Sequence, residues 1–268
     1  MAHDSLDEFK QKQREMWSSF APSAIFTTPV AANLVSFAGI HAGQQVLDVG
    51  TGTGVVAITA ARLGAQVSAL DLTPELLEQA KEDAAIAGQP QIDWMEGDAE
   101  KLPYLDNSFD VVVSQFGHMF APRFEVVVRE IHRVLKPGGL FAFTSWPPEH
   151  LMGRVFMLVD SYADAHSSTT SSPELWGDPH VITQRLGDLF DTPFFERGTM
   201  LSPALSKSHR RIAFERSFGP LRQVMQRLEA HPEKLKKLRE TMDNLIEPYC
   251  INNQCHQSYL MTRSRVIK

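Results

Sequence analysis

Val46-Leu47-Asp48-Val49-Gly50-Thr51-Gly52-Thr53-Gly54 is the stretch that decides the fold of this chain. An apolar run leads into three glycines spaced two residues apart, and a helical pattern follows from Val55 to Leu63 and ends at Gly64. Short apolar runs suit buried parallel strands, and a glycine just past the last periodic residue is typical of a helix end. The stretch therefore predicts a strand, a tight glycine turn and a helix.

Asp48 indicates which kind of ligand this turn would hold. Glycines remove side chains where a ligand approaches the backbone, and the start of the helix offers free amides. A dinucleotide site has the pattern G-x-G-x-x-G, but Val55 stands at its third glycine position. The carboxylate of Asp48 would repel a pyrophosphate and attract a cation. We therefore favour a cationic ligand, and a glycine turn without a ligand is the alternative.

The chain then alternates strand and helix patterns, which predicts a mostly parallel sheet with helices on both faces. Asp71 ends the second predicted strand, 23 residues after Asp48. In nucleoside-binding α/β sheets, an acid at this point holds the ribose, because one carboxylate accepts from two hydroxyls. A turn aspartate on the surface is the alternative. The remaining core strands are predicted at Ile92–Met95, Phe109–Val113 and Leu140–Trp146.

The pattern D-x-G-x-G-x-G from Asp48 to Gly54 resembles the first motif of class I S-adenosylmethionine-dependent methyltransferases. The segments 102–112 and 133–139 are similar to the ubiquinone/menaquinone-type branch of that family, and the resemblance covers about residues 42–146. It implies S-adenosylmethionine as the cofactor. It also implies a Rossmann-like sheet of seven strands, mostly parallel with one antiparallel edge strand, helices on both faces and a helical lid.

The resemblance assigns each cofactor contact to a part of the site. Asp48 would bind the methionyl ammonium directly or through water, Asp71 would hold the ribose, and Leu72 would lie against the adenine. Asp98 and Ala99 would read the adenine edge, although Gly-Asp pairs are common in turns. The remaining contacts fall on the glycine turn and beside the sulfonium, and they are Gly50, Thr51, Gly52, Gly54, Ser114 and Gln115.

Four segments are expected. Residues 1–41 form an N-terminal helical cap and residues 42–146 form the cofactor-binding core. Residues 147–257 form a mostly helical substrate lid with one core strand, and residues 258–268 form the last core strand. Helices are expected at 4–19, 29–38, 124–135, 151–166, 180–189 and, with breaks at Gly219-Pro220 and His231-Pro232, over 207–247; a strand is expected at 194–201 and a flexible Ser/Thr connection at 167–172.

Methyl transfer from a sulfonium is an in-line displacement, so the protein mainly aligns the acceptor and excludes water. No obligatory nucleophile or metal is expected. His118, just beyond the fourth strand, is the candidate catalytic base, since a neutral imidazole is available near pH 7. A histidine that only lines the pocket is the alternative. His150 and Trp146 are weaker pocket candidates.

Composition narrows the classes of partner. The net charge of −6 and pI near 5.9 give no pull toward nucleic acid, and no apolar run is long enough for a bilayer span. Two cysteines and a polar N-terminus favour the cytoplasm. The basic residues of 207–239 and the group Asp160, Asp164 and His166 are expected to be exposed helix faces rather than docking or metal sites.

The leading hypothesis is a cytoplasmic S-adenosylmethionine-dependent methyltransferase that acts on a small molecule. Two alternatives stay open. A nicotinamide-dependent oxidoreductase could use the same sheet, but Asp48 and Val55 argue against it. A non-catalytic S-adenosylmethionine-binding protein is the other, because methyl transfer needs few dedicated groups.

Overall fold

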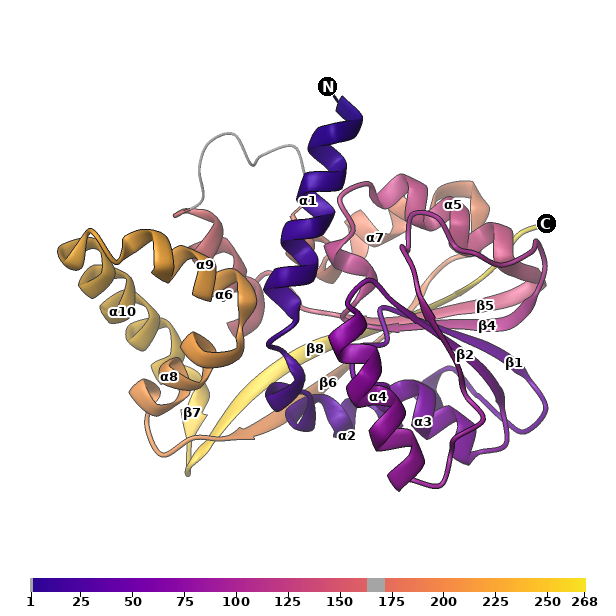
Figure 1. The fold of residues 1–268 in the computed structure, drawn as a ribbon, viewed down its shortest axis with the longest axis horizontal. Helices are drawn as coiled ribbons and strands as arrows, with labels where there is room; N and C mark the ends of the chain where they lie inside the picture. Colours follow the sequence, from indigo (N-terminus) through magenta and orange to yellow (C-terminus); the bar gives the residue numbers. More distant parts are fainter. Residues whose placement is uncertain (1, 163–171) are drawn as a thin grey trace.

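The computed structural model describes residues 2–162 and 172–268, and its centre is a twisted sheet (Figure 1). The strand order is β3-β2-β1-β4-β5-β8-β6, with a short β7 that pairs only with β8. The neighbouring strands from β3 to β5 are parallel, and β8 runs antiparallel to both β5 and β6. The strands are β1 (Gln45–Val49), β2 (Gln66–Asp71), β3 (Asp93–Glu96), β4 (Phe109–Gln115), β5 (Leu135–Ser145), β6 (Phe194–Pro203), β7 (Cys250–Ile251) and β8 (Gln254–Arg265).

This arrangement confirms the predicted α/β class, with a mostly parallel sheet and an antiparallel section at one edge. Seven strands lie on the main path, and the two-residue β7 lies beside it. The antiparallel strand β8 is second from the edge, and β6 is outermost. The last strand begins at Gln254, four residues before the predicted start at Ser258.

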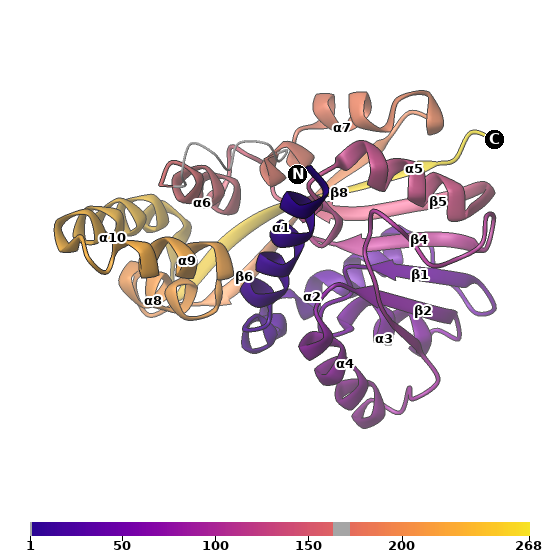
Figure 2. The ribbon, with the colours of Figure 1, turned by 45° about the horizontal axis from the view of Figure 1, so that its top comes forward.

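Helices cover both faces of the sheet (Figure 2). On one face, α2 (Ala21–Phe37), α3 (Val55–Arg62) and α4 (Pro74–Ile86) pack below the strands in that view, while α5 (Phe124–Val134) and α7 (Pro179–Leu186) lie above. Alanines of α3 are fully buried, because small side chains let this helix approach the sheet closely. The buried positions of α5 fall one helical turn apart and face the strands, as an amphipathic helix requires; they are Val127, Val128, Ile131 and Val134.

Four helices of the segment 147–257, which the sequence predicts as a lid, form a group beyond the β6–β8 end of the sheet, at the left of Figure 1, whereas α7 of the same segment lies over the sheet. The group contains α6 (Leu151–Asp160), α8 (Lys207–Ser217), α9 (Gly219–Leu228) and α10 (Pro232–Ile246). Pro220 and Pro232 each lie in a first helical turn, where a missing amide costs little, so the two predicted breaks are confirmed. Helix α1 (Ala2–Trp17) crosses between this group and the sheet. The 3-10 turns are η1 (His118–Phe120), η2 (Pro173–Gly177), η3 (Gly187–Leu189) and η4 (Glu247–Tyr249).

Two predicted segments outside the core either differ from the structure or lie partly outside the described residues. The second helix begins at Ala21, so the prediction that it starts at Pro29 was wrong. Pro22 sits in the first turn, and Pro29 lies inside the helix, where it cannot donate the usual hydrogen bond to the carbonyl of Ile25. The end of the predicted helix 151–166, including Asp164 and His166, and residues 167–171 of the predicted connection lie outside the described residues.

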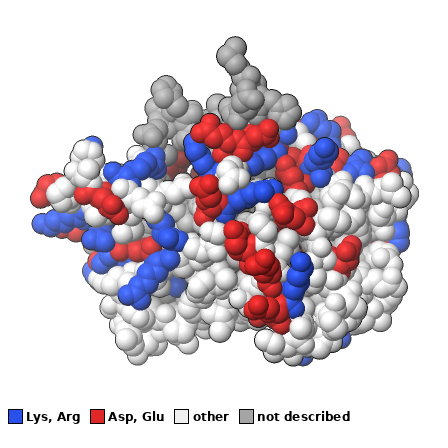
Figure 3. Space-filling model, in the orientation of Figure 1, with Lys and Arg blue, Asp and Glu red and all other residues white. Residues whose placement is uncertain are grey.

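Most basic residues of the 207–239 segment lie on helix faces open to solvent, and three of them, Lys207, Arg211 and Arg239, pair with acids. The prediction of an exposed face was wrong for Arg210, which is 5% exposed and packs over the ring of Phe214. Arg211 bonds Asp243 at 2.8 Å, and Arg239 bonds Glu215 at 3.0 Å. Figure 3 accordingly shows positive and negative side chains mixed over these helices, at the left of the molecule. In the described part of the chain, no single helix is long and apolar enough to cross a bilayer; α1 and α2 meet those limits only together, across an 87° bend.

Candidate functional site

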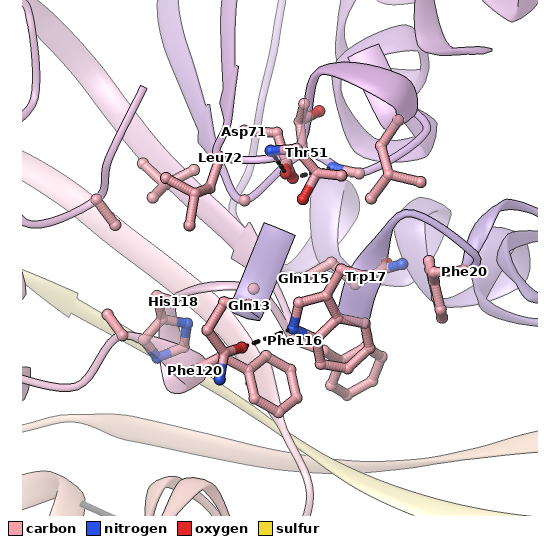
Figure 4. A pocket seen from close by; sticks show the side chains of 18 of the residues that line it. Gln13, Trp17, Phe20, Thr51, Asp71, Leu72, Gln115, Phe116, His118 and Phe120 are labelled. Carbon is pink, nitrogen blue, oxygen red and sulfur yellow. Dashed lines mark hydrogen bonds between the residues drawn. The ribbon is translucent and has the colours of Figure 1, made fainter. Parts of the chain in front are cut away.

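A cavity of about 1340 Å³, including its opening to solvent, lies at the carboxyl ends of β1, β2 and β4. Ligands of open α/β sheets bind at this edge, where the strand order changes direction. The view into the cavity separates two ends (Figure 4). Thr51, Asp71 and Leu72 gather at one end, and the rings of Trp17, Phe116 and Phe120 gather at the other.

The glycine turn after β1 forms the floor of the polar end. Gly50 has φ +67°, and a Cβ there would lie 2.8 Å from the Cα of Gly117, so only glycine allows these two loops to touch. Gly54 also has a positive φ, and a Cβ there would lie 2.6 Å from the ring of Trp94. The turn therefore has the backbone shape that the sequence predicts. Thr51 and Gly52 line the cavity, while Gly54 begins α3 and packs on β3.

Asp48, in the cavity wall, is 1% exposed, and only one of its two carboxylate oxygens has hydrogen-bond partners. Its Oδ2 accepts from Thr51 Oγ1 at 2.6 Å and from the Ala57 amide at 3.2 Å. Its Oδ1 is buried without a hydrogen-bond partner. Burial, together with the negative charge of nearby Asp71, raises the pKa of Asp48 to about 7 although its hydrogen bonds oppose the shift. A cationic donor at Oδ1 would relieve this penalty.

Asp71 closes the polar end from the tip of β2. Its Oδ2 accepts from the Gly52 amide at 2.7 Å, and its Oδ1 accepts from the Thr73 amide at 2.9 Å. Burial raises the pKa of Asp71, and these amide bonds oppose the rise. Each carboxylate oxygen has a second lone pair, so the side chain ties the glycine turn to β2 and can still accept from a ligand diol.

Asp98, at the end of β3, has a partner that sequence reasoning missed. Lys10 of α1 places Nζ 2.5 Å from Asp98 Oδ2 and 2.6 Å from Glu100 Oε2. Although burial opposes the charge on Lys10, these hydrogen bonds raise its pKa above the usual value. Glu100 is held in turn by Arg123 at 2.8 Å. The ion-pair cluster fastens α1 across the site, next to the lining residue Ala99.

Helix α1 contributes four lining residues, which are Phe9, Lys10, Gln13 and Trp17. Their spacing puts them on one side of the helix. The sequence predicts this helix, but a helix face that lines a cavity and one that only packs on the core have the same apolar pattern, so the lining role was missed. Met16 of the same helix packs on α9, since a Cβ on Gly219 would lie 2.4 Å from its Cγ.

Aromatic side chains form the second end of the cavity. Phe116 follows β4 with φ +59°, a backbone conformation that bulky residues rarely adopt. Its ring stacks on Trp146 with centroids 3.9 Å apart and planes 4° apart. Trp17 contacts Phe120 with centroids 4.6 Å apart. Strain of this kind persists where the surroundings enforce it, often at a binding site.

His118 lines the cavity from η1, but its ring packs among apolar neighbours. The ring is 1% exposed and meets Phe143 and Trp176 edge-on, each at 4.5 Å between centroids. Neither ring nitrogen has a hydrogen-bond partner. Burial, with the positive charge of Arg185, lowers the pKa of His118 to about 3. A neutral imidazole in this place can exchange one hydrogen bond with a ligand but is a weak proton acceptor.

The other predicted residues fall in different places. Gln115 lines the cavity, with its Nε2 bonded to the Thr27 carbonyl at 3.2 Å and its Oε1 buried without a partner. Ser114 lies behind the wall, where Oγ donates to the Val49 carbonyl at 2.7 Å and accepts from the His118 amide at 2.9 Å. His150 lies near the surface, with its Nε2 2.9 Å from a guanidinium nitrogen of Arg197.

Comparison with known proteins identifies related chains. Residues 47–143 match the model of the methyltransferase domain family. The chain is 32% identical over 256 residues to an uncharacterised protein of Mycobacterium tuberculosis, covering 94% of this chain and 93% of that protein. It is 40% identical over 153 residues to the ubiquinone/menaquinone biosynthesis C-methyltransferase of Rubrivivax gelatinosus, covering 52% of this chain and 58% of that enzyme.

Solved structures agree at the level of the fold. A Bacillus halodurans protein, provisionally assigned as a methyltransferase, superposes with a TM-score of 0.60 at 22% identity, covering 89% of this chain and 99% of that chain. The phosphoethanolamine N-methyltransferase 2 of Haemonchus contortus, solved with S-adenosylmethionine, gives a TM-score of 0.55 at 18% identity, over 90% of this chain and 53% of that one. With its motif, its sheet and its methyltransferase relatives taken together, this chain belongs to the class I S-adenosylmethionine-dependent methyltransferase family.

Proposed function

We propose that this protein transfers a methyl group from S-adenosylmethionine to a small-molecule acceptor. The observation that carries the proposal is the buried, unpartnered Oδ1 of Asp48 in the cavity wall. A buried carboxylate oxygen without a donor is costly, and an ammonium group on the ligand would supply the donor. The methionyl end of the cofactor carries such a group.

The charges of the cavity support a cationic cofactor over a dinucleotide. Asp48 and Asp71 line the polar end, while the lining cation Lys10 is already paired with Asp98 and Glu100. A pyrophosphate placed against two buried carboxylates would be repelled. Asp71 would hold the ribose, Leu72 would contact the adenine, and Asp98 with Ala99 would contact its edge. The side chain of Lys10 would share Asp98 Oδ2 with the adenine amine or move away.

When bound, the cofactor supplies an activated methyl carbon, and the protein's part is alignment and exclusion of water. Gln115 would lie near the sulfonium, and Ser114 would fix the loop by bonding both Val49 and His118. Holding two reactants in line can lower the barrier by roughly 7–11 kcal/mol. We propose that His118 lines the acceptor end and offers a hydrogen bond, rather than carrying the proton, because its ring is buried and its pKa is low.

The segments 1–41 and 147–257 would act as cap and lid. Four residues of α1 line the cavity, and so do Met152 and Phe156 of α6. We propose that these two segments enclose the acceptor and determine its identity, while residues 42–146 hold the cofactor. The cytoplasmic location stays a prediction from the cysteine content.

Calorimetric titration tests the proposal. We expect S-adenosylmethionine and S-adenosylhomocysteine to bind, and we expect the nicotinamide dinucleotides to bind at least about a hundredfold more weakly, since two buried carboxylates face the phosphates. Tighter binding of a nicotinamide dinucleotide would overturn the proposal in favour of an oxidoreductase. Methyl-labelled cofactor, incubated with pooled metabolites, then tests for transfer. Tight binding with no transfer to any pool would favour a non-catalytic binding protein.

A further inference from the structure

The two cysteines of the chain face each other across a short hairpin, far along the chain from the cofactor turn. Cys250 of β7 is the Cα partner of Cys255 of β8, and a single residue pair separates them from the turn. The turn consists of Asn252 and Asn253, with φ of +52° and +60°. Two successive positive φ values are typical of a type I′ turn, which joins the strands of tight hairpins.

The register of this hairpin places the cysteines where a disulfide can join them. A two-residue turn closes on a hydrogen-bonded pair, here Ile251 and Gln254, and the type of pair alternates from there. Cys250 and Cys255 are therefore a non-hydrogen-bonded pair, a type in which the Cα atoms lie about 4.5 Å apart and the side chains share one face. Disulfides span Cα atoms about 4.4–6.8 Å apart, so the bond needs little backbone movement.

The two thiols are free, in contact with each other, and unequal in their access to solvent. Cys255 is fully buried in the core, whereas Cys250 is partly exposed. Burial and the hydrogen bond with the Cys250 thiol raise the pKa of Cys255, although the charge of Arg210 opposes the rise. A reagent from solvent therefore meets Cys250 first, and Cys255 reacts with a sulfur already attached to Cys250.

Arg210 of α8 is a buried cation beside this pair. It is 5% exposed, and its Nη2 donates to Gln257 Oε1 at 3.2 Å. Its Nε is buried without a hydrogen-bond partner, and no carboxylate of the described residues pairs with the guanidinium. Burial lowers the pKa of Arg210, and the two nearby cysteines oppose that shift. A cation close to a cysteine favours the thiolate, which is the form that attacks a disulfide.

We propose that Cys250 and Cys255 form a reversible disulfide by exchange with a low-molecular-weight disulfide such as oxidised glutathione. The Cys250 thiolate attacks one sulfur of the reagent, which forms a mixed disulfide and releases one glutathione. The Cys255 thiol then loses its proton and attacks the Cys250 sulfur, and the second glutathione leaves and takes up that proton. The two cysteines lose two electrons and two protons, and the reagent is reduced to two thiols.

This bond would fasten the lid helices to the sheet. β7 follows directly on α10 and η4, and it pairs with β8 over two residues (Figure 1). So short a ladder is a weak attachment by itself. α10 also packs against α6, whose Met152 and Phe156 line the cavity. The disulfide would therefore hold the last lid helix, and its neighbour at the cavity, to the central sheet. The proposal does not depend on methyl transfer.

Equilibration of the whole protein with glutathione tests the geometry. Native and urea-unfolded samples are held at a series of ratios of squared reduced to oxidised glutathione, and free thiols are then trapped with N-ethylmaleimide and counted by intact mass spectrometry. We expect a monomer with an internal disulfide, and half-oxidation of the native protein at a ratio at least about tenfold higher than in urea, because the fold holds the thiols together. An equal or lower ratio in the native protein, or a covalent dimer as the main product, would overturn the proposal.

Cysteine variants test the order of the two steps. Cys255→Ser should stop at the mixed disulfide and keep one glutathione on Cys250. Cys250→Ser should leave Cys255 unmodified in the native protein, because this thiol has no exposed surface. Modification of Cys255 at the rate of Cys250 would contradict this order.

Two further measurements test the arginine and the lid. Arg210→Met should slow the first step about fivefold, while Arg211→Met is the matched control, since Arg211 pairs with Asp243. Equal rates in the two variants would refute the role of Arg210. In the unsubstituted protein, oxidation should slow hydrogen exchange of the amides of residues 247–251 at least about tenfold. Unchanged exchange there would refute the fastening of the lid.

Discussion

Replacing Asp48 by Asn should stabilise the ligand-free protein at high pH, although it removes a group that we assign to the site. The pKa of this carboxyl is raised from 3.8 to about 7, first because burial disfavours the charged form and also because Asp71 lies nearby. At about 1.36 kcal/mol per pH unit, ionised Asp48 costs the folded state about 4 kcal/mol at pH 8. This value is an upper bound, since the asparagine amide would leave one buried donor unpaired at a cost of roughly 1–3 kcal/mol.

The pH dependence of the stability difference between the two proteins isolates the contribution of the Asp48 carboxyl, because the cost of the unpaired amide does not change with pH. A carboxyl with a raised folded-state pKa makes stability fall as pH rises from about 4 to about 7, and the loss is constant above that range. Between pH 5 and pH 8, the stability of Asp48→Asn relative to the unmodified protein should therefore rise by roughly 2.7 kcal/mol.

Urea unfolding at pH 5, 6, 7 and 8, followed by circular dichroism, measures this difference directly. Subtracting the two proteins cancels the titration of all other groups that the substitution does not affect. A constant difference across the series would mean that Asp48 titrates normally, and the reasoning about a buried, half-satisfied carboxylate would be refuted.

Three further substitutions test other parts of the site. Asp71→Ala should weaken binding of S-adenosylhomocysteine by a few kcal/mol, because the ribose diol loses its acceptor. It should also lower Tm, because the Gly52 amide loses its acceptor. Unchanged calorimetric affinity would contradict the ribose assignment. Lys10→Met should speed hydrogen exchange in α1 about tenfold, since partly buried ion pairs are worth roughly 1–2 kcal/mol. Lys12→Met is the control, because the Lys12–Glu8 pair is exposed. Equal rates of hydrogen exchange in α1 of both variants would argue against the claim that Lys10 fastens this helix. His118→Leu should keep turnover within about tenfold and leave the shape of the pH–turnover profile unchanged, because the pKa of this histidine is about 3. A loss of ~10²–10⁴-fold would restore the role as base.

The cofactor end of the site could be predicted from sequence because its information is local. The strand, the glycine turn and the helix follow one another, and the turn needs glycine for reasons visible in one short stretch. Asp48, Asp71 and Asp98 lie at or just beyond the ends of three strands, and parallel strands bring their carboxyl ends to one edge of the sheet. The positions of these three acids along the chain therefore predicted that they lie together at one edge of the sheet.

The contacts of α1 and the protonation of His118 could not be predicted in the same way, because they depend on distant segments. Lys10 and Asp98 are 88 residues apart, and nothing in either neighbourhood indicates the other. The position of His118 after β4 suggested a base, but its protonation is set by Phe143 and Trp176, which lie far along the chain. Local pattern places a residue on an element, whereas tertiary packing sets its charge and its neighbours.

Calorimetric titration of two ligands into two proteins at pH 8 tests the central claim, that Asp48 holds the ammonium of the cofactor. S-Adenosylhomocysteine carries that ammonium, and 5′-methylthioadenosine has the same nucleoside without it. Asp48→Asn should weaken S-adenosylhomocysteine binding by roughly 10–100-fold, the worth of a charge-assisted hydrogen bond, and leave 5′-methylthioadenosine binding within about twofold. An equal loss for both ligands, or no loss for either, would contradict it.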